Sequence, residues 1–168
     1  MYHLIPERAQ DVYEVEALFD LSFAPGREAL SSYRLRDDVA PVAALNTVAR
    51  DADGILAGAV RYWPVLTGGQ PSLLLGPIAV HPTRQGEGLA GQLMRHSLVA
   101  AAARGWLRVM LVGDAPYYQR FGFTRLDHVV MPPPTNPERV LGRALAGDAW
   151  VGVTGPVTRW PEARAFPD

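Results

Sequence analysis

The spacing of hydrophobic residues changes from a helical to a strand period near residue 40. Residues 2–5 form a short β-compatible segment. Apolar positions from Val12 to Phe23 then recur three or four residues apart, which predicts a helix over residues 7–23. A second, more polar helix is predicted over residues 27–36.

From residue 43 the period changes, and Leu45, Thr47 and Ala49 have the spacing of a strand. Strands are predicted over residues 43–49, over residues 55–66 and over the apolar run 73–80. Short turns rich in Gly, Pro and Asp separate the three segments. We therefore expect three neighbouring strands in an antiparallel meander.

A long amphipathic segment follows the third strand. Residues 90–104 carry one apolar stripe, and Gly105 is placed to end the predicted helix. A buried strand is predicted over residues 107–112. Because a strand–helix–strand crossover returns the chain in the same direction, strands 73–80 and 107–112 should be parallel neighbours.

The last third of the chain predicts shorter elements. We expect a short helix over 114–122, a strand over 123–130, a helical turn or two over 139–145 and a last strand over 149–157. The fold class is then α+β, with a mixed, mostly antiparallel central sheet of about six or seven strands and helices on both faces. One domain over residues 1–168 is expected.

Composition and net charge exclude several kinds of partner and reaction. The net charge of −1 gives no general attraction to nucleic acid or membrane, and no apolar run is long enough to span a bilayer. The start of the sequence has no secretory pattern, so a cytoplasmic location is expected. The absence of Cys excludes disulfides and a cysteine acyl-enzyme, and the absence of Lys excludes Schiff-base chemistry. The four His show no metal spacing, so we expect no metal.

A glycine-rich turn connects strand 73–80 to the long helix. Its residues are Gln85-Gly86-Glu87-Gly88-Leu89-Ala90. A turn of this kind directs backbone N–H groups and the positive end of a helix toward one point, where an anion binds favourably. Spacing alone fits a surface turn that only caps the helix equally well.

Two motifs in this region point to a family. The run Ile78-Ala79-Val80-His81-Pro82 followed by Gln85-x-x-Gly88-x-Ala90 resembles motif A of the GNAT superfamily of N-acetyltransferases. Tyr118-Gln119-Arg120-Phe121-Gly122-Phe123 resembles the late Tyr-x-x-x-Gly-Phe signature of that superfamily. Two further runs, Gly113–Tyr118 and Tyr33–Arg36, resemble a bacterial subgroup of predicted acetyltransferases. Gln85 and Ala90 stand where Arg and Gly are commoner.

The resemblance implies acetyl-CoA, or another short acyl-CoA, as cosubstrate and a splayed parallel strand pair. The amides of Gln85, Gly86, Glu87, Gly88, Leu89 and Ala90 would hold its pyrophosphate. The backbone edge of Ile78, Ala79 and Val80 would pair with the pantetheine arm, with the strands at Val80 and Leu111 splayed to admit it.

The same resemblance assigns a chemical role to Tyr118. Its phenol would protonate the departing thiolate, while a strand amide near Ile78 or Val80 polarises the carbonyl. Acetyl would pass directly to a primary amine, of a small molecule or a peptide, in a ternary complex. Two alternatives stay open: Tyr118 only packs beneath the short helix, or the chain is a CoA-binding regulatory module without catalysis.

The sequence leaves the roles of several other residues undecided. His81, Asp114, Glu28 and Tyr33 are all candidates for the general base, although His81 also fits a capping or solvated residue. Arg84, Arg95 and Arg120 fit either CoA phosphate contacts or a solvated face. The apolar residues of 150–160 fit a homodimer interface or ordinary core packing. The acceptor-lining loops, around 23–36 and 131–137, carry no recognisable chemistry.

Overall fold

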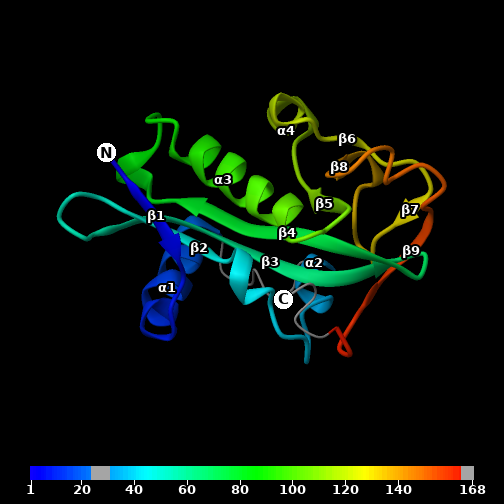
Figure 1. The fold of residues 1–168 in the computed structure, drawn as a ribbon, viewed down its shortest axis with the longest axis horizontal. Helices are drawn as coiled ribbons and strands as arrows, with labels where there is room; N and C mark the ends of the chain where they lie inside the picture. Colours follow the sequence, from blue (N-terminus) through cyan, green and yellow to red (C-terminus); the bar gives the residue numbers. More distant parts are fainter. Residues whose placement is uncertain (24–30, 164–168) are drawn as a thin grey trace.

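The described part of the chain folds as a central sheet between two layers of helices. The computed structural model describes residues 1–23 and 31–163 (Figure 1). The strands are β1 (His3–Pro6), β2 (Thr47–Arg50), β3 (Leu56–Thr67), β4 (Gln70–Val80), β5 (Arg108–Val112), β6 (Thr124–Arg125), β7 (Val129–Val130), β8 (Val140–Ala144) and β9 (Gly155–Arg159). The α-helices are α1 (Val12–Ser22), α2 (Ser31–Arg34), α3 (Leu89–Ala103) and α4 (Ala115–Tyr118). The 3₁₀ turns are η1 (Ala9–Asp11), η3 (Ala43–Leu45), η4 (Pro82–Arg84), η5 (Gln119–Phe121) and η6 (Pro137–Arg139).

The sheet is mostly antiparallel, and its order is β1-β2-β3-β4-β5-β8-β6. Strand β9 pairs with β3 and also with β7. The predicted meander is confirmed as β2–β3–β4. Its β3–β4 hairpin turns at Gly68 and Gly69, whose φ angles of 53° and 82° suit a two-residue turn.

Helices cover both faces of the sheet, as expected. Figure 1 shows α3 and α4 on one side and α1 and α2 on the other. Alternation along β3 explains this arrangement, because Ala59 packs in the cluster with α1 whereas Val60 packs in the cluster with α3. The predicted stripe of α3 is buried at Leu93, Met94 and Leu98, among others.

A buried hydrogen bond fixes α3 on β3. The Tyr62 hydroxyl lies 2.7 Å from the Ser97 hydroxyl, and Ser97 also donates to the Leu93 carbonyl at 2.7 Å. Burial raises the pKa of Tyr62 well above its usual value, so the phenol stays neutral. The pair orients α3 with respect to the sheet.

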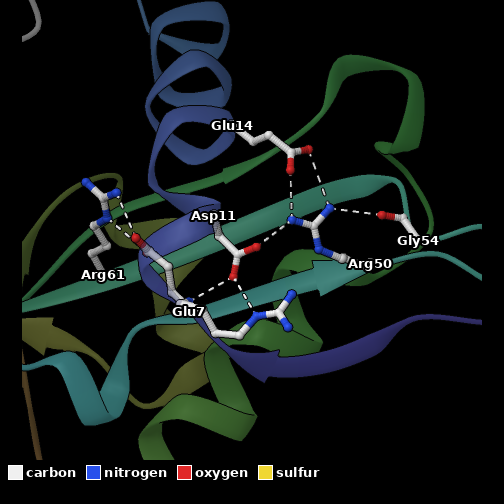
Figure 2. Close-up of polar contacts among 7 residues, drawn as sticks. Glu7, Asp11, Glu14, Arg50, Gly54 and Arg61 are labelled. Carbon is white, nitrogen blue, oxygen red and sulfur yellow. Dashed lines mark hydrogen bonds and ion pairs between the residues drawn. The ribbon is translucent and has the colours of Figure 1, made fainter.

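On the opposite face, ion pairs fasten the start of α1 to the sheet (Figure 2). Asp11 is 1% exposed, accepts from the Arg8 N–H at 2.8 Å and pairs with Arg50 at 2.8 Å. Arg50 also contacts Glu14 at 3.0 Å and donates to the Gly54 carbonyl at 2.9 Å. The backbone bond from Arg8, helped by the Arg50 guanidinium and opposed by burial, lowers the pKa of the Asp11 carboxyl.

The parallel pair β4–β5 is short. Its register contains Leu73 opposite Val109 and Leu74 opposite Met110. Beyond that point β4 carries a bulge, since Gly76 and Pro77 both stand opposite Arg61 of β3. Strand β5 remains paired with β8 over Arg108–Val112. The two strands therefore separate past residue 74, and the expected splay is present.

Some predicted elements are wrong or shifted. Residues 140–144 form strand β8 rather than a helical turn, because five of them pair with β5 and two also pair with β6. Residues 123–130 form two strands of two residues each, interrupted at His128, whose φ is 60°. The last strand begins at 155, not at 149.

The remaining differences concern element starts. Residues 43–45 form a 3₁₀ turn before β2, and η1 precedes α1. The start of the predicted helix 27–36 lies outside the described residues, and α2 covers residues 31–34. Trp150 and Trp160 each pack against a core cluster, as expected for core packing; a homodimer remains a prediction.

Candidate functional site

A cavity of about 610 Å³ lies where β4 leaves β5. Three segments line it: the end of β4, the glycine-rich turn with the first turn of α3, and the segment from α4 into η5. From the predicted site, the lining residues are Ile78, Ala79, Val80, Gln85, Gly86, Gly88, Leu89, Ala90 and Tyr118. Glu87 is not among the lining residues, because its carboxylate turns to the Tyr2 hydroxyl, which donates at 2.9 Å.

The strand edge on one side of the cavity is open. Residues 78–80 pair with β3 through Val60, Ala59 and Gly58. On their other side, the register with β5 has already ended at residue 74. An extended backbone without a strand partner on one side can accept a further extended, amide-bearing chain.

The glycine-rich turn places the amino end of α3 at the same cavity. Gly86 and Gly88 have φ angles of 84° and 76°, which side chains with a Cβ rarely adopt. Gly88 is the N-cap of α3 without a side-chain cap, and the Gln92 N–H makes a bond to the Gly88 carbonyl. The earlier N–H groups of the helix have no intrahelical acceptor, so this end suits an anion.

Three arginines add positive charge to the cavity. Arg84, Arg95 and Arg120 all line the cavity. Arg84 is held by Asp51 at 2.5 Å, whereas Arg120 stacks over the Tyr117 ring at 4.7 Å. Bonds to Tyr2 and Asp51 raise the pKa of Arg84, which keeps it charged.

Tyr118 lies at the other end of the cavity, in the last position of α4. Its ring packs edge-on against Tyr117 and Phe123, with centroid distances of 5.0 and 6.1 Å. Gly113 makes room for it, since a Cβ at Gly113 would lie 2.4 Å from Tyr118 Cε2. Among the described residues, none hydrogen-bonds to the Tyr118 hydroxyl, so the packing alternative in which a backbone carbonyl holds it finds no support.

The protonation state of Tyr118 follows from its surroundings. Burial is the main cause that raises the pKa of Tyr118, and the neighbouring Tyr117 and Asp114 act in the same direction. Arg139 opposes them. The phenol is therefore protonated at neutral pH and can act as a proton donor.

Tyr118 also lines a second cavity on the α2 side of the sheet. This cavity, of about 140 Å³, shares Ile78 and Tyr118 with the first one. A third cavity, of about 230 Å³, adjoins it and shares Tyr33, Arg36 and Pro77. Tyr118 thus stands at the splay, where spaces from both faces of the sheet meet.

The candidate bases differ in position. The His81 ring accepts from the Thr83 N–H at 3.2 Å, which supports its capping role. Asp114 is exposed at the start of α4, and Glu28 lies outside the described residues. Tyr33 lines both cavities of the α2 side.

Sequence reasoning missed part of this second space. The sequence pattern gives Arg36, in the run Tyr33–Arg36, no role and does not distinguish Trp63. Both line the cavities of the α2 side. The available signal was an arginine and a tyrosine three residues apart, which share one face of a helical turn.

Residues 1–23 and 31–163 contain neither a cluster of metal-ligating side chains nor a membrane-spanning helix. In that part of the chain, no three His, Asp or Glu side chains cluster as metal ligands would. No helix there combines the length and apolar character that crossing a bilayer requires.

Comparisons with known proteins agree with this geometry. The family model described as an acetyltransferase (GNAT) domain matches residues 44–125. YhbS of Escherichia coli K12, named an uncharacterised N-acetyltransferase, is 35% identical over 150 residues, covering 86% of this chain and 88% of YhbS.

Two crystal structures resemble the whole fold. One is the GNAT family N-acetyltransferase YhbS from Escherichia coli in complex with CoA, with a TM-score of 0.80 and 31% identity over 95% of this chain and 89% of that chain. The other is a GNAT family acetyltransferase from Brucella melitensis in complex with acetyl-CoA, with a TM-score of 0.71 and 29% identity over 99% of this chain and 98% of that chain.

Proposed function

Because the chain belongs to the GNAT superfamily of N-acetyltransferases, we propose that it transfers an acetyl group from acetyl-CoA directly to a primary amine. The observation that carries the proposal is the path from the α3 amino end, along the open edge of β4, to the Tyr118 hydroxyl. It offers in sequence an anion site, an unpaired strand edge and a proton donor.

The residues of the large cavity fit the parts of acetyl-CoA. The amides of residues 85–90 receive the pyrophosphate, and Arg84, Arg95 and Arg120 add positive charge around it. The free edge of residues 78–80 pairs with the amides of the pantetheine arm. Acetyl-CoA supplies an activated thioester at the far end of that arm.

Transfer needs one bond made and one broken. The neutral amine nitrogen attacks the thioester carbonyl carbon, and the carbon–sulfur bond then breaks. A backbone N–H near Ile78 or Val80 stabilises the oxyanion, and the Tyr118 hydroxyl gives its proton to the sulfur. The proton lost by the amine goes to water or to a base, for which Tyr33 is the best placed of the described candidates.

One observation favours a second candidate function. No carboxylate of the described residues lines either cavity that Tyr118 lines. A CoA-binding regulatory module without catalysis would need no base. The protonated Tyr118 at the cavity junction favours the enzyme.

The test measures acetyl-CoA consumption with a broad panel of amines, next to CoA affinity. The enzyme proposal expects thiol release with at least one amine and initial-rate patterns of a ternary complex. Tight CoA binding without turnover of any amine would favour the regulatory module. A ping-pong pattern would contradict direct transfer. The reaction is proposed for the cytoplasm, where cells hold acetyl-CoA.

A further inference from the structure

The beginning of the chain lies beside the glycine-rich turn. In the β1–β2 pair, His3 stands opposite Arg50. Tyr2 therefore lies next to the turn that Asp51 begins. Figure 1 shows the N-terminus beside the segment that joins β4 to α3. The Tyr2 ring packs against the main core cluster, which fixes the position of its hydroxyl next to the turn.

Glu87 is the carboxylate residue within the glycine-rich turn. It lies between Gly86 and Gly88, and there is open space where a Cβ on either glycine would stand, so the turn itself offers little packing to hold the Glu87 side chain. The Tyr2 hydroxyl donates to Glu87 Oε1 at 2.9 Å, although 85 positions separate the two residues. Among the described residues, Tyr2 is the hydrogen-bond partner of this carboxylate. The direction of the Glu87 side chain thus depends on Tyr2.

A carboxylate released at this position would act against a bound anion. Gly88 is the N-cap of α3 and provides no side-chain cap, so the first N–H groups of the helix attract negative charge. A released Glu87 carboxylate can turn toward these groups, where it competes with a phosphate for them and repels it. In the structure, Glu87 bonds to Tyr2 and is not among the residues that line the large cavity.

Arg84 and Asp51 form a second polar contact of this region. They pair at 2.5 Å, and the Asp51 carboxylate also accepts two backbone N–H groups of its own turn at 2.9 Å. Tyr2, and after it Asp51, raises the pKa of Arg84, which stays charged. Asp51 is thus held by its own turn and by Arg84, whereas Glu87 is held from a segment far away in the sequence.

We propose that Tyr2 is a positioning residue of the cosubstrate site, whose hydroxyl holds the Glu87 carboxylate away from the phosphate-binding amides. This inference rests on the proposed function, because that function assigns the turn to the CoA pyrophosphate. Tyr2 acts through Glu87 and does not touch the reacting atoms. It should therefore govern the affinity for CoA and leave the chemical step unchanged.

The experiment compares wild type, Tyr2→Phe, Glu87→Ala and the double variant. Calorimetry gives the affinity for CoA in the absence of any amine, and initial rates with an acetylated amine give kcat and the KM for acetyl-CoA. Tyr2→Phe removes only the hydroxyl and keeps the ring on the core. Tyr13→Phe is the matched control, because the Tyr13 side chain is 86% exposed.

We expect Tyr2→Phe to weaken CoA binding by roughly three- to tenfold, and to raise the KM for acetyl-CoA in proportion while kcat stays within about twofold. In the Glu87→Ala background, the same substitution should change CoA affinity by less than about twofold, because no carboxylate is left to release. The loss in Tyr2→Phe should also be smaller in about 1 M salt, which screens the carboxylate from the phosphate. Tyr13→Phe should leave CoA affinity, KM and kcat unchanged.

The outcomes separate this inference from the acetyl transfer. An equal loss of CoA affinity from Tyr2→Phe with and without Glu87 overturns the inference, because Tyr2 would then act only through packing. Unchanged CoA affinity in Tyr2→Phe also overturns it and leaves the transfer standing. If no amine is acetylated, but the loss appears in Tyr2→Phe and disappears in the double variant, the inference stands and the transfer fails. A wild type that binds no CoA overturns both.

Discussion

The two halves of β4 have similar apolar sequences and opposite roles. Residues 72–75 are buried, pair with β3, and at Leu73 and Leu74 also pair with β5. Residues 78–80 keep only the β3 partner, and Ile78 and Val80 are half-buried at the cavity. The bulge at residues 76–77 separates the closed half, residues 72–75, from the open half, residues 78–80. Hydrophobicity therefore does not distinguish a core strand from a binding edge; the number of strand partners does.

The largest expected effect concerns Tyr118, at the open half. Tyr118→Phe should lower kcat by about 10²- to 10⁴-fold, because the thiolate would leave without a positioned acid. CoA affinity should hold, since the ring stays. Stopped assays of thiol release give kcat, and calorimetry gives the affinity. The control is Tyr117→Phe, which keeps the ring pair and should retain most of the activity; an equal loss there would remove the special role of Tyr118.

The pH dependence of kcat also tests the role of Tyr118 as proton donor. Because the folded-state pKa of Tyr118 is raised, its proton is present at all pH values below its usual value of about 10. We expect no alkaline loss of kcat from this group below that pH. A loss centred near neutral pH that disappears in Tyr118→Phe would contradict the assigned protonation state.

The next effect concerns the anion end of the open half. Gly88→Glu brings a carboxylate and a strained φ to the turn, and should weaken CoA binding by about 10²-fold or more, the equivalent of two charge-assisted bonds. Gly54→Glu is the matched control: Gly54 also has a positive φ, 79°, with open space around a Cβ, but lies in another turn. Equal CoA affinity for the two variants would place the phosphate site elsewhere.

Substitutions that affect the closed half should lower the free energy of unfolding and leave CoA affinity unchanged. Ser97→Ala leaves the buried Tyr62 hydroxyl without its partner and should cost about 1–3 kcal/mol in the free energy of unfolding. Tyr62 stands opposite Leu75, in the closed half. Urea unfolding measures the loss. The CoA affinity of Ser97→Ala should stay unchanged. Weaker CoA binding with an unchanged free energy of unfolding would contradict the assignment of this half of β4 to stability.

The smallest effect concerns the ion pairs in Figure 2. The pKa of Asp11 is lowered on folding, so its contribution to stability is present above the unfolded pKa of about 4 and is lost as the pH falls through the lower folded value. Urea midpoints of Asp11→Asn should therefore depend less on pH than those of wild type below about pH 4. Asp53→Asn, at an exposed turn, is the control and should behave as wild type.

The sequence predicts most of the framework because its signals are local. The apolar segment 55–66 follows from a strand that is covered on both faces, and the stripe of α3 follows from a helix that buries one face. The shift to β8 could not be foreseen, because residues 140–144 gain their extended form from pairing with β5, far away in the chain. Of the motif residues 78–80, 85–90 and 118, all but Glu87 line the large cavity, and their roles there stay predictions. The two smaller cavities are lined by residues from α2, β3 and β4, which are far apart in the sequence, so no spacing predicts them.

The splay also has a consequence for the order of events. The large cavity lies on the face of α3 and α4, whereas the cavity of about 140 Å³ lies on the face of α2, and Tyr118 lines both. A molecule bound on one face of the sheet therefore does not block binding or release on the other face. For the proposed reaction we therefore expect acetyl-CoA and the amine to bind in either order, and CoA to leave while the acetylated product is still bound.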